Sequence, residues 1–465
     1  MYDAALDHPL DEAELRRLEA EYCSWGDTVH YMPEPKFFES CEGSFLHDAE
    51  GRSFLDLQMW YSAVNFGYRN PRLNAAAHRQ LDRLPQVASQ YLHREKVELA
   101  AMIARDAEAK FGAKGRVHFN VGGAQAIEDS LKLVRNACGG KSLMFAFEGG
   151  YHGRTLGASA ITSSYRYRRR FGHFGERAQF IEFPYHFRGP KGMSKEEYGH
   201  LCVQKFARLF ETEYNGVLDT KTGQAEFAAF YVEPIQGTGG YVVPPPNFFV
   251  ELKAVLDRYG ILLVVDEVQM GFFRTGKLWS IEHFGVQPDI LVFGKALTNG
   301  LNPLSGLWAK EALINPTVFP PGSTHSTFNA NPMGTAVALE AMKMMAEGDY
   351  ATQVAAKGAY FLQGLRELQA RWPQIGDVDG LGLALRAEIC EADGFTPAKA
   401  LLDRMCEEGM KGDLEAGGRR LGLVLDVGGY HKNVITLAPS LEISFEEIDL
   451  ALELIDALLR RCVSG

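Results

Sequence analysis

The chain has 465 residues, of which 46% are hydrophobic and 23% are charged, so it is long enough for two domains with substantial cores. Its formal net charge of −11, from 48 basic and 59 acidic residues, argues against nucleic acid or an anionic membrane as the main partner. The seven cysteines are scattered without a C-x-x-C pair, no apolar run approaches membrane-spanning length, and the first residues lack a secretory pattern. We therefore expect a cytoplasmic protein with free thiols, no bound metal and no membrane partner.

The pattern of apolar residues predicts short strands that alternate with helices. A β-hairpin comes first, with strands at 45–48 and 53–56 around a four-residue turn. Beyond Gly123, Ile127, Leu131 and Val134 recur at helical spacing. Further elements are expected in this order: strands at 143–147 and 227–232, a helix at 248–259, strands at 261–265, 290–293 and 304–309, and a last helix that begins with a capping box at Ser444 and Glu447.

Continuous apolar strands separated by helices indicate an α/β fold, in which a mostly parallel, mixed sheet is covered by helices on both faces. We assign residues 76–340 to this large domain. The N-terminal segment 1–75 and the C-terminal segment 341–465 are expected to form a smaller α+β domain together.

An acid and a lysine follow two of the predicted strands directly. The apolar run 261–265 leads into Asp266, and the run 290–293 leads through Gly294 into Lys295. In open α/β sheets, ligands bind beyond the carboxyl ends of the strands, so these two side chains are expected to face one site. The alternative is a structural ion pair, since buried charges persist when they are paired.

The chemistry of these two side chains points to pyridoxal phosphate. A buried lysine amine forms an imine with an aldehyde cofactor. The ring of the cofactor withdraws electrons while its nitrogen is protonated, and a carboxylate such as Asp266 favours that protonation. The aldehyde and the nitrogen lie at opposite ends of the ring, so the lysine and the acid must come from different strands. Val268 is expected to pack on the ring face and Gln269 to bind the ring hydroxyl.

A glycine-rich turn and an aromatic residue complete the expected cofactor site. Gly122 and Gly123 lie between a strand and the start of a helix, where free backbone N–H groups attract an anion such as a phosphate. Tyr151, in the run 149–155, can supply an aromatic face for the ring.

These runs together resemble class III aminotransferases of PLP fold type I. The resemblance rests on Glu233–Gly237, Asp266–Phe272, Arg274–Gly276 and Phe293–Lys295, and it extends from the hairpin to the last helix. It implies a homodimer whose active sites lie at the subunit interface. It implies that Lys295 is the Schiff-base lysine and general acid–base catalyst, and that Asp266 pairs with the pyridinium. The other cofactor contacts that it implies are Gly123, Ala124, Tyr151, His152, Glu233, Val268, Gln269 and, in the neighbouring subunit's phosphate site, Thr327.

The resemblance also suggests two substrate-binding residues. Tyr61 matches a tyrosine of ornithine aminotransferase that binds the far carboxylate of the substrate, and Arg154 matches an arginine that holds the same end. An arginine suits a carboxylate because its fork donates two parallel hydrogen bonds. The alternatives are a core aromatic for Tyr61 and a structural salt bridge for Arg154.

Two positions depart from the family pattern. Many members carry a glutamate after Gln-Gly, which neutralises an arginine near the C-terminus that binds 2-oxoglutarate; here those positions are Thr238 and Thr436. Either the usual half-reaction with 2-oxoglutarate is altered, or Lys432, His431 or Arg274 supplies the positive charge of the missing arginine.

We expect an aminotransferase that moves an amino group from an ω-amino or diamino acid to a keto acid. The alternative is an amino-acid racemase or epimerase on the same scaffold, because racemisation needs no second substrate.

Overall fold

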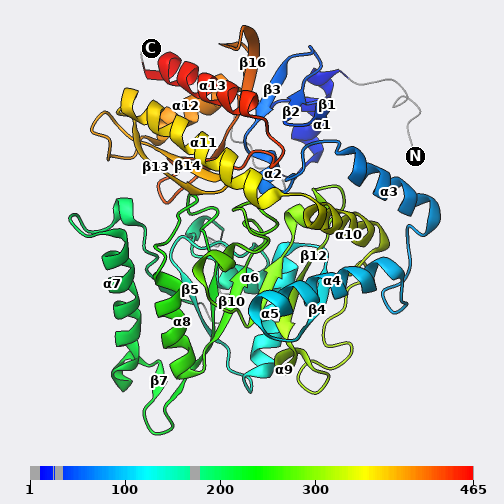
Figure 1. The fold of residues 1–465 in the computed structure, drawn as a ribbon, viewed down its shortest axis with the longest axis vertical. Coiled ribbons are helices and arrows are strands. Elements are labelled where there is room, and N and C mark those ends of the chain that lie inside the picture. The colour runs from blue at the N-terminus through cyan, green and yellow to red at the C-terminus, as the bar shows by residue number, and fades with distance from the viewer. Residues whose placement is uncertain (1–10, 25, 27–34, 168–177, 464–465) are drawn as a thin grey trace.

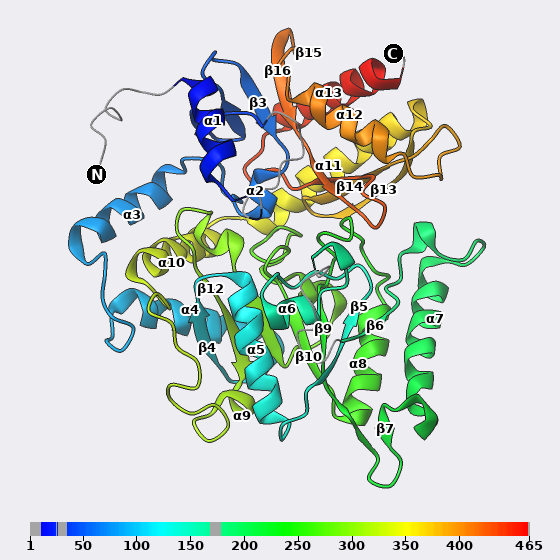
Figure 2. The same cartoon turned by 180° about the vertical axis from the view of Figure 1, so that it is seen from behind.

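The computed structural model describes residues 11–24, 26, 35–167 and 178–463. Two parts are visible in Figure 1, and the view from behind in Figure 2 shows the same arrangement. The lower part contains a large sheet with helices around it. The upper part brings the strands near the N-terminus beside the last helix, so both ends of the described chain contribute to it.

The large part is built on a seven-stranded sheet in which neighbouring strands are parallel except at one strand. The order is β4 (Gly115–Asn120), β12 (Ser305–Lys310), β11 (Ile290–Phe293), β10 (Leu262–Asp266), β9 (Phe227–Val232), β5 (Leu143–Phe147) and β6 (Gln179–Ile181). Strand β12 runs antiparallel to both β11 and β4. The expected mixed, mostly parallel sheet is therefore confirmed, with β10 and β12 each starting one residue later than predicted.

Both faces of this sheet are buried, which explains why its strands are continuously apolar. Leu263 and Val265 of β10 belong to the same hydrophobic core as Leu252 of helix α8 (Phe248–Tyr259). Val264, which points the other way, belongs to a second core with Ile127 of helix α5 (Gly123–Ala137). The remaining helices of this part are α3 (Pro71–Arg83), α4 (Arg94–Phe111), α6 (Leu156–Ala160), α7 (Lys195–Ala207), α9 (Glu311–Ile314) and α10 (Pro332–Glu347), and a small hairpin is made by β7 (Leu218–Asp219) and β8 (Gln224–Ala225).

The smaller part contains two sheets. The first has the order β1 (Ser40–Glu42), β2 (Phe45–His47), β3 (Ser53–Asp56), β16 (Arg419–Val424) and β15 (Leu414–Ala416), and the second has the order β13 (Ile375–Leu381), β14 (Ala384–Ile389), β18 (Val434–Leu437) and β17 (Asp426–Gly428). Its helices are α1 (Glu12–Tyr22), the short α2 (Met59–Ser62), α11 (Tyr350–Arg371), α12 (Lys399–Gly409) and α13 (Phe445–Val463). The predicted hairpin is present as β2 and β3. The parallel pairing of β3 with β16 joins the two ends of the chain in one sheet.

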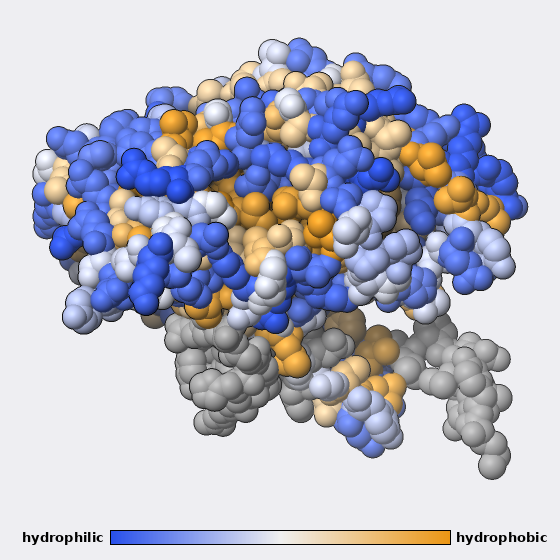
Figure 3. Space-filling view, turned by 90° about the horizontal axis from the view of Figure 1, so that it is seen from below, coloured by the Kyte–Doolittle hydropathy of each residue, from blue (hydrophilic) through white to orange (hydrophobic). Residues whose placement is uncertain are grey.

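The last helix begins as predicted. The Glu447 N–H donates to the Ser444 hydroxyl at 3.0 Å, and the Ser444 N–H donates to the Glu447 carboxylate at 2.8 Å. In the described part of the chain, no helix combines the length and apolar character that a membrane crossing needs. On the face drawn in Figure 3, hydrophobic side chains gather near the centre inside a hydrophilic surround.

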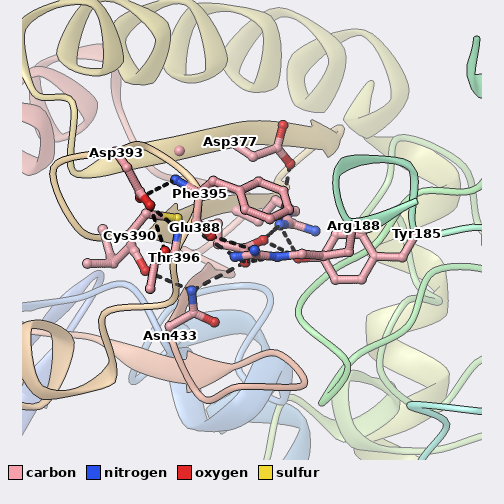
Figure 4. A network of polar contacts seen from close by, with 12 residues as sticks. Tyr185, Arg188, Asp377, Glu388, Cys390, Asp393, Phe395, Thr396 and Asn433 are labelled. Carbon is pink, nitrogen blue, oxygen red and sulfur yellow. Dashed lines mark hydrogen bonds and ion pairs between the residues drawn. The ribbon is translucent and has the colours of Figure 1, made fainter. Parts of the chain in front are cut away.

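A buried polar network connects the two parts (Figure 4). Tyr185 precedes the short 3-10 turn His186–Arg188 of the large part, and Arg188 ends it. Both side chains donate to the Glu388 carboxylate on β14. Arg386, also on β14, donates to the Tyr185 hydroxyl and pairs with Glu388. Asn433 donates to Glu388 at 3.2 Å. This network holds the segment before β18 against the large part.

Candidate active site

Lys295 and Asp266 lie at the same edge of the large sheet, as the sequence predicts. Asp266 is the last residue of β10 and pairs in register with Val292 of β11, three residues before Lys295. Lys295 opens a 3-10 turn, Lys295–Thr298, with a positive φ of 44°. Both side chains line one cavity of about 190 Å³. A left-handed conformation is unusual for lysine, and such strain is concentrated at functional sites.

The electrostatic surroundings favour a reactive amine on Lys295. Burial lowers the pKa of this amine. The carboxylates of Asp266, Glu233 and Asp426 oppose part of that shift, in decreasing order of effect. A neutral amine is the form that attacks an aldehyde.

Asp266 is held by two hydrogen bonds. One of its oxygens lies 2.9 Å from Nδ1 of the buried His152, and the other accepts the N–H of Val268 at 3.0 Å. An ionised carboxylate can only accept, so the imidazole is the donor. The resemblance alone gives His152 a cofactor contact; in the structure it lines the cavity and also orients the aspartate. Only its place beside Tyr151 in the sequence hints at that second role.

Glu233 fixes two loops of the cavity. Its carboxylate accepts the N–H of Tyr151 at 2.8 Å and the N–H of Gly237 at 2.9 Å. Burial raises the pKa of Glu233 to about 7. Gln269 lies across the same cavity and donates to the hydroxyl of Tyr241 at 3.0 Å. These contacts place the predicted Tyr151, Glu233, Val268 and Gln269 around Lys295 and Asp266.

The start of helix α5 forms the opposite end of the cavity. Gly123 and Ala124 line it, and the N-cap residue Gly122 makes no side-chain cap, so the first N–H groups of the helix are open to an anion. Gly153 packs against this turn with a φ of +130°, and a Cβ there would come within 2.6 Å of the Ala124 Cβ. Only glycine fits this close approach.

This set of groups fits pyridoxal phosphate. A buried lysine amine, a carboxylate held by His152 and an open helix N-terminus surround one cavity, and each matches one end of the cofactor. Thr327 is the exception. It is exposed on the loop before α10 and lines neither this cavity nor its neighbour. Its expected contact lies across a subunit interface, and it stays a prediction.

A second cavity of about 440 Å³ adjoins the first and shares Tyr151, Gln269 and Lys295 with it. Both predicted substrate residues, Tyr61 and Arg154, line this second cavity.

Tyr61 is half-buried rather than part of the core. It lies in α2, where four successive residues from Met59 to Ser62 have positive φ. Each such residue costs roughly 1–2 kcal/mol, so the surrounding structure must stabilise this turn. Its anchor is Asp56, whose carboxylate accepts the N–H groups of Gln58 and Met59.

Arg154 is exposed at this cavity and stacks on the ring of Tyr167, with its guanidinium carbon 4.7 Å from the ring centroid. No ion pair joins it to another residue of the described ranges, so the alternative of a salt bridge gains no support there. Tyr151 and Tyr167 are its hydrogen-bonding neighbours, and the guanidinium lines the cavity where a substrate carboxylate would bind.

The structure separates the three candidates for the missing arginine. Arg274 is fully buried and donates to the Leu383 and Pro439 carbonyls, so it is not available to substrate. His431 is exposed and does not line the cavity. Lys432 does line the cavity, with Arg166 beside it. Burial lowers the pKa of Lys432, and the charge of Arg166 adds to that shift.

The sequence analysis missed several residues of the larger cavity, including Arg166, Tyr167 and the acid Asp426. Asp426 follows the apolar run 421–425 just as Asp266 follows 261–265, and this pattern is the signal that could have revealed it. Its carboxylate lines the larger cavity together with Thr238 and Lys295. Thr436, at the position of the usual arginine, is buried and donates to Asp426 at 2.8 Å.

Comparison with known proteins agrees with this geometry. The sequence pattern of the class-III aminotransferases matches residues 28–459. An ornithine aminotransferase of Brevibacillus brevis is 31% identical over 437 residues, which cover 92% of this chain and 95% of that protein. An alanine/serine racemase of Pyrococcus horikoshii is 31% identical over 425 residues, 91% of this chain and 85% of that protein. The solved structure of an (S)-enantioselective omega-transaminase from Thermomicrobium roseum matches with a TM-score of 0.86 at 29% identity, covering 98% of this chain and 100% of that one.

Proposed function

Because the chain belongs to the class-III aminotransferases, we propose that it transfers an amino group from an ω-amino or diamino acid to a keto acid. It is a pyridoxal-phosphate-dependent aminotransferase. The observation that carries the proposal is the meeting of Lys295, Asp266 and Arg154 at two adjoining cavities.

Each residue has a distinct task in this proposal. Bound pyridoxal phosphate supplies an aldehyde carbon for the amino group and a ring that accepts electrons. Lys295 would hold the aldehyde carbon, and once released from it, its Nζ would take a proton from the substrate carbon and return it elsewhere. Asp266 would face the ring nitrogen, oriented by His152 and by the Val268 N–H. The N-terminus of α5 at Gly123 and Ala124 would take the phosphate.

The donor carboxylate is assigned to the larger cavity. Arg154 and Lys432 line it and both are cationic side chains, whereas Arg274 is unavailable. A donor that reacts at Lys295 through its terminal amine can direct its carboxylate toward Arg154. Tyr61 lines the same cavity and offers a phenol beside that carboxylate.

The proposal includes a homodimer in the cytoplasm. Thr327 and the neighbouring Phe328, which is 67% exposed, lie at the surface and do not line this chain's own cavities, which leaves both side chains accessible to a second subunit. The cysteines of the described ranges are free thiols, which suits a reducing compartment. Size-exclusion chromatography with light scattering tests the dimer.

A racemase is the second candidate, and one relative carries that name. The absence of the Glu–Arg pair at 238 and 436 favours it, because a racemase needs no keto acid. The test mixes purified holoenzyme with single amino donors in D₂O without keto acid. Conversion of the cofactor to pyridoxamine phosphate supports the aminotransferase. Exchange of the α-proton without that conversion contradicts it and supports the racemase.

A further inference from the structure

Asp426 is fixed in the wall of the substrate cavity by neutral groups. It lies in β17, directly opposite Thr436 of β18 in the antiparallel register. One carboxylate oxygen accepts the Thr436 hydroxyl at 2.8 Å, and the other accepts the Gln58 amide at 3.2 Å. Both oxygens therefore have a set direction, and the side chain cannot turn away from the cavity without losing these bonds.

This carboxylate forms no ion pair within the ranges that the structure describes. The charges of Lys295 and Lys432 act on it only at longer range. Burial raises the pKa of Asp426, which reflects the cost of a charge without a charged partner. Part of its surface nevertheless opens into the cavity that also contains Lys295. A cationic group of a bound molecule would supply the missing partner.

The sign of charge at this wall is thus the reverse of the family pattern. An arginine at position 436 would present a cation to a substrate carboxylate, but Thr436 instead supports an anion. The cationic side chains Arg154 and Lys432 line the same cavity. The cavity is therefore equipped for a molecule with both a carboxylate and an ammonium group besides the amine that reacts.

We propose that Asp426 is a specificity-determining residue that binds the second ammonium group of the donor, so that the substrate is a diamino acid. This inference rests on the proposed aminotransferase function and narrows its substrate class. Thr436 is a positioning residue, because it acts through Asp426. The same carboxylate repels the second carboxylate of a keto diacid, so the acceptor is a keto acid with one carboxylate.

The test compares donors that differ only in the second ammonium group. The pairs are 2,4-diaminobutanoate with 4-aminobutanoate, ornithine with 5-aminopentanoate, and lysine with 6-aminohexanoate, each with pyruvate as acceptor. We expect wild-type holoenzyme to prefer the diamino member of at least one pair by 10-fold or more in kcat/KM. Asp426→Asn should reduce that ratio by 10-fold or more, and Thr436→Val should reduce it less.

Asp377→Asn is the matched control, because this acid lies on β13, outside both cavities. In this variant the ratio of kcat/KM between the two donors of a pair should stay at the wild-type value. If Asp426→Asn does not fold, the ratio of kcat/KM between the two donors in Thr436→Val tests the role of Asp426 by itself. Equal use of both members of every pair by wild-type enzyme, or an unchanged ratio in the folded variants, would overturn the assignment of Asp426 and leave the aminotransferase function intact. Absence of amino transfer from all six donors, with exchange of the α-protons of the three diamino acids, would contradict the aminotransferase function itself.

Discussion

Nδ1 of His152 lies 2.9 Å from Oδ2 of Asp266, and this contact fixes the acid that faces the cavity. The imidazole is almost fully buried, so water does not compete for the carboxylate. With the Val268 N–H on the other oxygen, Asp266 is held on both sides. The same geometry gives Asp266 a fixed orientation before any cofactor binds, which lowers the cost of binding.

Lys295→Ala should abolish multiple turnover, because it removes both the anchor for the aldehyde and the group that moves the proton. The cofactor can still bind through the α5 N-terminus and Asp266. Turnover and the absorption spectrum of the purified variant measure the effect. Lys399→Ala, which changes an exposed helix lysine, is the control. Near-normal turnover of Lys295→Ala would refute the central assignment.

Asp266→Asn should lower kcat by about 10³-fold or more, equivalent to roughly 4 kcal/mol in the barrier, because an amide carries no charge to keep the ring nitrogen protonated. Asp266→Ala should be at least as impaired. Single-turnover rates with a saturating donor measure the loss. Asp257→Asn on the exposed side of α8 should have no effect. A variant that keeps more than about a tenth of the wild-type rate would show that another group faces the ring nitrogen.

Arg154→Ala should weaken carboxylated donors far more than simple amines of the same length. Loss of a charge-assisted contact to a carboxylate costs about 2–4 kcal/mol, which is roughly 30- to 1,000-fold in kcat/KM. The measurement compares 5-aminopentanoate with 1-aminopentane. Arg116→Ala, at an exposed pair with Glu311, is the control. An equal loss for both donors would mean that Arg154 supports the fold rather than the carboxylate.

Wild-type enzyme should use pyruvate at least as well as 2-oxoglutarate, since the usual arginine is absent. Thr238→Glu with Thr436→Arg restores the family pair, but the new guanidinium would lie beside Asp426 and be neutralised by it. We therefore expect the triple variant with Asp426→Ala to gain more activity with 2-oxoglutarate than the double variant. The ratio of kcat/KM for the two acceptors tests this order. A strong wild-type preference for 2-oxoglutarate would indicate that Lys432 replaces the arginine fully.

The stability of the protein should fall as the pH rises toward neutrality, and Glu267 should contribute to this. Burial raises its pKa to about 7, above the value of about 4.3 for an exposed glutamate. The folded state then binds a proton more tightly, so this contribution is complete below about pH 4.3 and is lost as the pH rises through about 7. Melting temperatures between about pH 5 and pH 8 measure it. Glu267→Gln should flatten the dependence only in part, because burial also raises the pKa of Glu233 to about 7.

The sequence by itself determined the central strands of the large sheet and the position of Asp266 and Lys295 at one edge of it. Asp266 and Lys295 each end a run of apolar residues, and parallel strands place their carboxyl ends at one edge. The helix after Gly123 and the last helix were predictable for the same reason, because hydrophobic spacing and capping are local properties. The domain bounds at 75 and 340 remain a prediction.

The walls of the substrate cavity were decided only by the tertiary structure. Asp426 reaches the cavity because β16 pairs with β3, more than 360 residues earlier in the chain, and no local pattern specifies that pairing. The left-handed turn that carries Tyr61 is stable only against its surroundings, since the backbone alone disfavours it. Arg274 looked available in the sequence, but two carbonyls from distant segments bury and bind it. Contacts between distant segments fix which charges face the substrate, and their free energy appears only when the chain has folded.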